Sequence, residues 1–246
     1  MKIFLRNLPS GFIRPTDAVE NLLFREYGSM YVARGGAVVP RFIVFRDETD
    51  VSNFQNSVDR QAERIGGMSM VLQAPVMRAL INAVNEAATQ GLTISPRDTD
   101  SAARSYSEAV GLWASRVDPG LDHWSANGKI SKADAERIRA LSPYAQVAKI
   151  LGLEQKGVYF SKDLSKSIIY SVAPPGTSQH LSMLAFDVTE YDNPKVRSIM
   201  EKNGWFQTVV SDLPHFTYLG VSESELPNLG LKQRVKDGRT YWVPDI

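Results

Sequence analysis

The chain has 246 residues, of which 43% are hydrophobic, and this is enough for one well-formed core with an appended subdomain. Its 28 basic and 27 acidic residues leave a formal net charge of +1, so the strongly basic footprint of a nucleic-acid-binding protein is absent. No segment approaches the roughly 18 consecutive apolar residues of a membrane span. Cysteine is absent, so disulfides and thiolate metal sites are excluded, and His, Asp and Glu remain as candidate metal ligands.

The first half of the chain has mainly helical patterns. Apolar residues recur at helical spacing in stretches that end at turn residues such as Gly66–Gly67 and Gly91. Ser131, with Asp134 three residues later, has the pattern of a helix N-cap. These patterns predict helices over 47–65, 74–90, 101–117 and from 131, and strands over 41–45 and 92–94.

The second half alternates short β-rich runs with turn residues. Asn193 followed by Pro194 is typical of a helix start, and Asn203–Gly204 marks the expected end of that helix. Because helices and short strands follow one another without a regular strand–helix–strand repeat, the expected fold class is α+β, with helices packed on a small antiparallel sheet. The predicted strands lie at 167–172, 184–188, 205–210, 215–219 and 240–243.

Two of the three histidines lie in one C-terminal stretch, and each has a carboxylate nearby. His180 precedes Asp187 by seven residues, and His215 follows Asp212 by three. A single histidine beside a strand is more often an ordinary core or surface residue. Together, however, two imidazoles and one carboxylate make the three protein ligands of a catalytic zinc, and a second carboxylate remains to handle protons. We expect the ligands to meet on adjacent antiparallel strands, with His180 on a loop that enters the first strand.

The segments Ser178–Val188 and Asp212–Gly220 resemble motifs of the zinc D-alanyl-D-alanine carboxypeptidase family, the VanY-like peptidases that cleave peptidoglycan stem peptides. The resemblance extends over roughly residues 67–220 and includes Ala103–Tyr106, which is similar to the Tyr-Arg-Ser motif of that family. It implies a Hedgehog/DD-peptidase-like α+β fold. It also implies two parts, an N-terminal extension (1–66) packed on the main domain and a zinc peptidase-like domain (67–246).

The resemblance assigns roles to individual residues. It implies that His180, Asp187 and His215 hold zinc and that Asp212 is the general base. In the same way, Arg104 matches the arginine that faces the substrate, with Arg97 as a competing candidate, and Ser178 matches a serine near the substrate backbone. Trp205 is expected in the core or in a wall of the substrate pocket.

The sequence also departs from the family pattern. Met183 stands where the family usually has glycine, and Pro214 stands where it has tryptophan. Three of the matched residues also have ordinary structural interpretations: Arg104 as a surface arginine at a helix N-terminus, Ser178 as a turn hydroxyl, and Asp212 as the cap of the following turn.

The resemblance therefore implies a zinc-dependent peptidase acting on peptidoglycan stem peptides, most simply a D-alanyl-D-alanine carboxypeptidase that uses a zinc-bound water and Asp212 as general base. The alternatives are an endopeptidase of the same family, a zinc amidase with another substrate, and a catalytically inactive zinc-containing scaffold that binds cell-wall peptides or a protein. Peptidoglycan substrates imply the periplasm or cell envelope. Residues 1–9 lack the apolar core of a secretory signal, so we expect a cytosolic chain or a mature form whose signal was removed.

Overall fold

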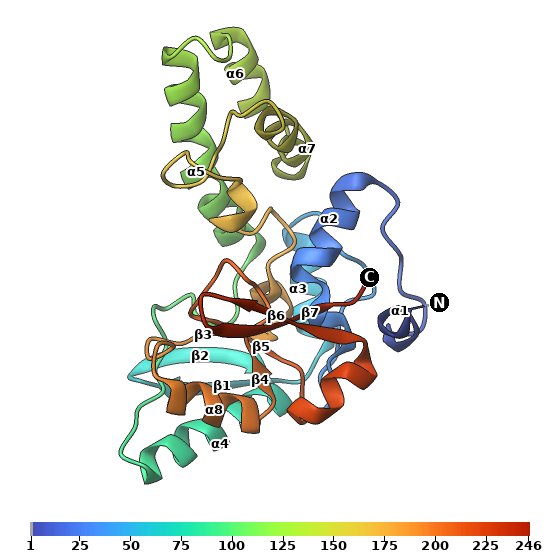
Figure 1. Ribbon diagram of the computed structural model, residues 1–246, viewed down its shortest axis with the longest axis vertical. Helices are drawn as coiled ribbons and strands as arrows, with labels where there is room; N and C mark the ends of the chain where they lie inside the picture. Colours follow the sequence, from blue (N-terminus) through green and yellow to red (C-terminus); the bar gives the residue numbers. More distant parts are fainter. Residues whose placement is uncertain (1) are drawn as a thin grey trace.

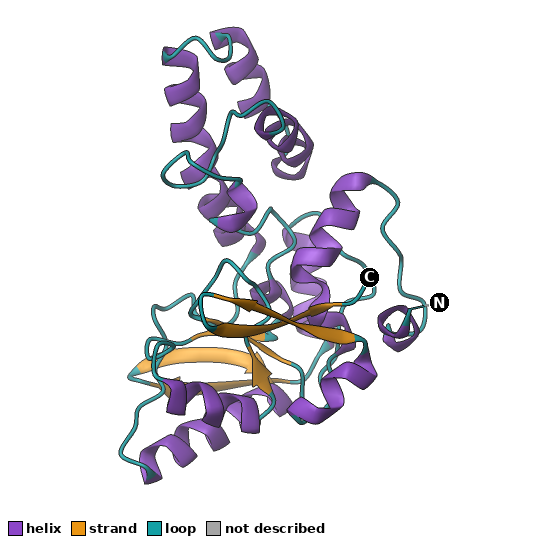
Figure 2. Ribbon diagram, viewed as in Figure 1, coloured by secondary structure: helices purple, strands orange, loops and turns teal. Residues whose placement is uncertain are grey.

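The computed structural model describes residues 2–246 and shows helices packed around three small antiparallel sheets (Figures 1 and 2). This arrangement confirms the predicted α+β class. One sheet has the strand order β3–β5–β4, and the other two are hairpins. The strands are β1 (Arg60–Ile65), β2 (Met68–Gln73), β3 (Ala185–Asp187), β4 (Trp205–Phe206), β5 (His215–Tyr218), β6 (Leu231–Lys236) and β7 (Arg239–Pro244).

Several of the α-helices begin at a residue whose side chain caps them. Ser131 accepts a hydrogen bond from the backbone N–H of Asp134, and Asn193 accepts one from Lys195, as their sequence patterns predict. No helix in residues 2–246 is both long and apolar enough to cross a membrane. The helices are α1 (Ile3–Asn7), α2 (Ala18–Tyr27), α3 (Glu48–Ser57), α4 (Ala74–Thr89), α5 (Tyr106–Ala126), α6 (Lys132–Arg139), α7 (Pro143–Glu154) and α8 (Pro194–Lys202), with 3-10 turns η1 (Gly28–Val32), η2 (Ile168–Tyr170), η3 (Gln179–Ser182) and η4 (Glu223–Leu229).

Some predicted elements are wrong. The helix predicted over 47–65 ends at Ser57, and residues 60–65 instead form β1, which pairs with β2 through a turn at Gly66 and Gly67. The helix predicted over 101–117 begins only at Tyr106, because Ser105 and Glu108 form a capping box there. Residues 41–45, 92–94 and 167–172 contain no strand, and the last of these ranges includes the 3-10 turn η2.

The N-terminal segment belongs to the main core. Phe4, Phe24 and Tyr31 are buried in the same apolar cluster as Trp205 and Phe216. The predicted boundary between residues 66 and 67 falls inside the turn of the β1–β2 hairpin, so it would divide one element into two. Residues 2–66 are therefore an integral part of the body that carries the C-terminal strands.

A helical unit, defined here as residues 106–170, has a separate core that the sequence did not indicate. Helices α5, α6 and α7 extend away from the sheets at the top of Figure 1. Their buried side chains pack on one another. The buried Glu154 carboxylate accepts hydrogen bonds from the N–H groups of Phe160 (3.2 Å) and Ile168 (2.7 Å) and from the Ser167 hydroxyl, and so fixes the loop that leads back to the sheets. The core of the helical unit includes the buried side chains of Trp113, Val117, Leu121, Val147, Ile150 and Phe160.

Two glycines of α5 test the packing of this core. A Cβ at Gly120 would lie 2.5 Å from Cδ1 of Phe160, whereas nothing lies within 4 Å of a Cβ at Gly111. Gly120→Ala should therefore lower stability by about 1–3 kcal/mol, because the overpacking outweighs the gain in helix propensity. Gly111→Ala, the matched control, should raise stability by up to about 1 kcal/mol. Urea unfolding measures both values, and stabilisation by both substitutions would contradict the packing described.

Candidate metal centre

The register of the central sheet brings two of the predicted ligands together. Strands β3 and β5 are antiparallel, and their pairing places Asp187 directly opposite His215. His180 lies in η3, just before β3, where burial leaves its side chain 2% exposed. Asp187 ends its strand and His215 begins its own, so all three side chains gather at one end of the β3–β5 pair.

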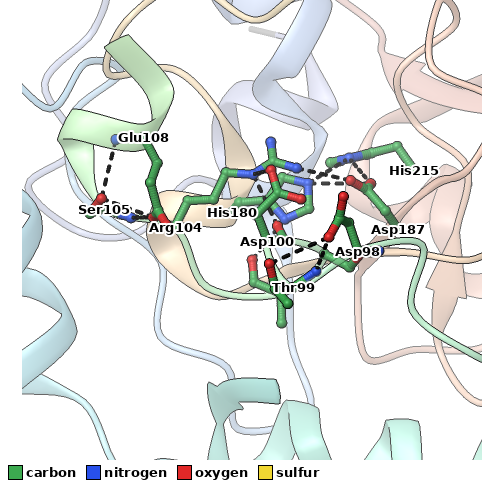
Figure 3. A network of polar contacts seen from close by, with 11 residues as sticks. Asp98, Thr99, Asp100, Arg104, Ser105, Glu108, His180, Asp187 and His215 are labelled. Carbon is green, nitrogen blue, oxygen red and sulfur yellow. Dashed lines mark hydrogen bonds and ion pairs between the residues drawn. The ribbon is translucent and has the colours of Figure 1, made fainter. Parts of the chain in front are cut away.

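The three side chains converge closely. The distance from Nε2 of His180 to Nδ1 of His215 is 3.2 Å, and Oδ1 of Asp187 lies 3.3 Å from the first nitrogen and 3.2 Å from the second (Figure 3). Ligands bonded to one tetrahedral zinc at about 2.0–2.2 Å stand roughly 3.3–3.5 Å apart from one another. The spacing of the three atoms therefore fits a shared zinc ion.

Hydrogen bonds on the far side of each ring assign its tautomer. Nδ1 of His180 donates to the backbone carbonyl of Ala102 (2.8 Å), and Nε2 of His215 donates to the amide oxygen of Gln179 (2.9 Å). Each ring then presents a lone pair, and not a proton, to the other ring and to the carboxylate. Because lone pairs at this distance repel one another, the arrangement calls for a cation between them, which is the strongest evidence for a metal.

Gln179 is itself held in place. Its amide nitrogen donates to the carbonyl of Tyr27 (2.8 Å), which fixes the amide oxygen toward His215. The hydroxyl of Thr217 also donates to this oxygen, and the hydroxyl of Thr208 lies 2.6 Å from that of Thr217. Gln179 is 1% exposed. Partners of this kind fix the orientation of metal-bound histidines.

Residues 95–104 pack against His180 and Asp187, the two ligands of the Ser178–Val188 segment. The backbone N–H of Asp187 donates to the carbonyl of Ser101 (2.9 Å), and its carbonyl accepts from the N–H of Arg97 (3.1 Å). The carboxylate of Glu190 accepts from the N–H (2.8 Å) and hydroxyl (2.6 Å) of Ser95 and so holds the start of this segment. The segment therefore supports the metal centre as well as covering it.

The guanidinium of Arg104 lies against the metal carboxylate. Nη2 donates to Oδ2 of Asp187 (3.0 Å), and Nε lies 3.0 Å from a carboxylate oxygen of Asp100 (Figure 3). The Arg104 side chain is only 13% exposed, so it is not the surface arginine that its sequence position also allowed. Arg104 fixes the position of Asp187, and it also lines a cavity that opens onto the three ligands.

Electrostatics keep the ligands in the protonation states that a metal needs. Burial lowers the pKa of His180, so its imidazole stays neutral. The guanidinium of Arg104, which donates to the Asp187 carboxylate, favours the ionised form of that group. Neutral imidazoles and an ionised carboxylate are the required donor forms.

Met183 ends the turn that carries His180. It adopts a left-handed conformation, with φ of 57° and ψ of 35°, which glycine adopts without strain. Here the methionine side chain is fully buried in the main core, and we infer that its packing offsets the backbone strain.

A cavity of about 250 Å³ opens onto the three ligands. Asp212 and Ser178 line it, as do Arg97 and Arg104. Asp212 is exposed and lines the cavity, and within residues 2–246 its carboxylate accepts no hydrogen bond that would cap the turn. Ser178 precedes η3 without making a side-chain cap. Trp205, in contrast, is fully buried between Phe186 and Tyr218 and does not line the cavity, so its place is in the core.

Sequence reasoning missed several parts of the centre. Gln179 carries no motif of its own, although it directly precedes His180. The Ala102 carbonyl is a backbone group, and side-chain patterns do not predict it. Asp100 and Arg116, from segments far from the histidine motifs, also line the cavity. Only their proximity in the fold connects them with the metal ligands.

The donor set, its geometry and its tautomers together fit zinc. We expect Gln179→Ala to weaken zinc binding about 10- to 100-fold, because His215 loses the acceptor that fixes its ring. The measurement is competition with a chromophoric chelator at neutral pH.

Two further variants calibrate that result. His123 is the third histidine and is exposed on α5, so His123→Ala should keep full affinity. His180→Ala removes a ligand and should lose stoichiometric zinc. Unchanged affinity in both the Gln179 and the His180 variants would contradict the assignment of the site.

Comparison with known proteins gives one structural similarity to report. No family model matches the chain, and no curated protein matches it. Among solved structures, the chain is similar to a crystal structure of the vancomycin resistance D,D-pentapeptidase VanY from a VanB-type resistance cassette, a point variant in complex with Zn(II). The similarity has a TM-score of 0.37 and 15% identity, and it covers 67% of this chain and 82% of that one.

Proposed function

We propose that this protein is a zinc-dependent peptidase that hydrolyses peptidoglycan stem peptides, most simply as a D-alanyl-D-alanine carboxypeptidase. The observation that carries the proposal is the convergence of three metal-ligand lone pairs on a cavity that also contains a free carboxylate. A catalytic zinc site needs this combination of three protein ligands, an open side and a nearby base. The resemblance of the histidine motifs supplies the substrate class, and the cell-envelope location follows only from that substrate.

Zinc held by His180, Asp187 and His215 would supply Lewis-acid activation of a water and of the scissile carbonyl. Asp212 would accept the proton of the attacking water and pass it to the leaving amine. Enclosure by the cavity walls raises the pKa of Asp212, and the charge of Asp187 raises it further. A carboxylate with a raised pKa is a better proton acceptor than an ordinary aspartate, and it gives up the proton more easily than a stronger base would.

The arginines favour a peptide with free carboxylates. Arg97 and Arg104 both line the cavity, but Arg104 is already engaged by Asp187 and Asp100. Arg97 is exposed, and no carboxylate of the described chain lies within ion-pair distance of it. We therefore propose that Arg104 holds Asp187 and offers its remaining N–H groups to the scissile region, while Arg97 attracts the substrate carboxylate at the cavity mouth.

Ser178 completes the proposed substrate contacts. Ser178 lines the cavity and its side chain forms no cap with the following turn, so we propose that its hydroxyl binds a substrate backbone group. Trp205 is left out of these contacts because it is fully buried.

Removal of the proposed base tests the function. Zinc-loaded protein should release a terminal D-alanine from a stem pentapeptide, and Asp212→Ala should retain zinc but lose roughly 10²- to 10⁴-fold in turnover. The products are measured by mass spectrometry, with cross-linked dimer as a second substrate. The matched control is Asp122→Ala, because Asp122 is exposed on α5 outside the residues that line the cavity.

Other products would redirect the proposal. Cleavage within the stem or the cross-link would make the protein an endopeptidase. Zinc bound at one ion per chain with no product from either substrate would contradict a peptidoglycan peptidase, and it would favour a binding scaffold or a different amide substrate.

A further inference from the structure

The helical unit forms one wall of the metal-centre cavity. Helix α5 buries Ala109, Trp113 and Val117 along one face. Leu112 and Arg116, one turn apart on the neighbouring face, both line the cavity. The chain then returns from the helical unit through η2 and lines the same wall at residues 169–173. A unit with its own core therefore contributes directly to the site.

Arg116 is held in position without a counter-ion. Its Nε donates to the hydroxyl of Ser171 (3.1 Å), and its Nη1 donates to the hydroxyl of Ser115 (2.9 Å). Within residues 2–246, no carboxylate lies within ion-pair distance of this guanidinium, and Nη2 has no acceptor. Arg104, in the same cavity, has two carboxylate partners.

A half-buried guanidinium is normally paired, because an unpaired charge loses solvation without compensation. The two serines hold the planar group through Nε and Nη1 and leave Nη2 available to an incoming anion. Such pre-orientation lowers the entropic cost of binding a carboxylate. The site thus has the properties of an anion-binding position that the protein does not fill from its own side chains.

The charge balance of the cavity points in the same direction. Three arginines (Arg97, Arg104 and Arg116) face three aspartates (Asp100, Asp187 and Asp212), so their formal charges cancel. A divalent cation at the metal centre would leave the cavity with a surplus of two positive charges. A peptide that carries free carboxylates complements this surplus.

We propose that Arg116 is a specificity-determining residue that binds a free carboxylate of the peptide substrate. This inference rests on the proposed peptidase function. The carboxylate has two possible sources with the same chemistry, the C-terminus of the peptide or an acidic group within it. Through Arg116, the helical unit selects acidic peptides and does not act only as a structural appendage.

The kinetic test compares three forms of one stem peptide: all carboxylates free, only the C-terminal carboxylate amidated, and only the other carboxylates amidated. For the free form, Arg116→Gln should raise KM roughly 10- to 100-fold and leave kcat within about twofold, because one charge-assisted contact to the bound peptide is lost. Arg116→Lys keeps the charge but not the fork and should restore part of the affinity. Arg137→Gln, an exposed arginine of α6, is the matched control.

The amidated peptides identify the source. Amidation of the peptide carboxylate that Arg116 binds should raise the wild-type KM by a similar factor. The Arg116→Gln protein should bind that amidated peptide as well as the wild type does. An Arg116→Gln KM equal to that of the wild type for all three forms would overturn the inference, as would an equal loss on all three.

A binding measurement separates this inference from the proposed catalysis. Calorimetry with the zinc-loaded Asp212→Ala protein, with and without Arg116→Gln, reports affinity without turnover. Carboxylate-dependent binding through Arg116 with no cleavage by the wild type would support the inference and contradict the catalytic proposal. Cleavage without any dependence on Arg116 would support the catalytic proposal and overturn the inference about Arg116. A lack of both binding and cleavage would overturn the two proposals together.

Discussion

The metal centre depends on three lone pairs, on two imidazole nitrogens and one carboxylate oxygen, that the fold holds close together. Backbone and side-chain acceptors behind His180 and His215 take the only proton on each neutral ring, so the inward nitrogens and the Asp187 oxygen repel one another at 3.2–3.3 Å. The β3–β5 register, the Gln179 network and the 95–104 segment hold the side chains in this arrangement against the repulsion. Binding of a cation would turn the repulsion into attraction, so the centre is already organised for a metal ion.

The residues around the metal centre extend this organisation into the cavity. Arg104 holds the metal carboxylate from one side, and the helical unit adds a wall that carries Arg116. Both connections of the helical unit enter the site, since α5 follows directly after Arg104 and Ser105, and the returning chain continues through residues 169–173 into η3. The metal centre and this wall of the cavity are therefore joined by short stretches of chain. Displacement of α5 would alter the position of Arg104 as well as that of Arg116.

The sequence predicted the ligands better than their surroundings. His180, Asp187 and His215 could be found because metal chemistry restricts residue type and because they occur at recognisable spacings in and just before two short strands. The β1–β2 hairpin was missed because residues 60–64 are mostly polar and continue an apparent helical pattern. Gln179, the Ala102 carbonyl and Arg116 depend on contacts between segments far apart in the chain, and no local pattern encodes them. For Trp205 the sequence left the core and a pocket wall open, and packing places it in the core.

The most direct test of the account is zinc-edge anomalous diffraction from crystals grown with zinc. The account predicts one strong peak bonded to Nε2 of His180, Nδ1 of His215 and a carboxylate oxygen of Asp187, at about 2.0–2.2 Å from each. A peak held by the opposite ring nitrogens, or zinc bound only elsewhere on the chain, would contradict it.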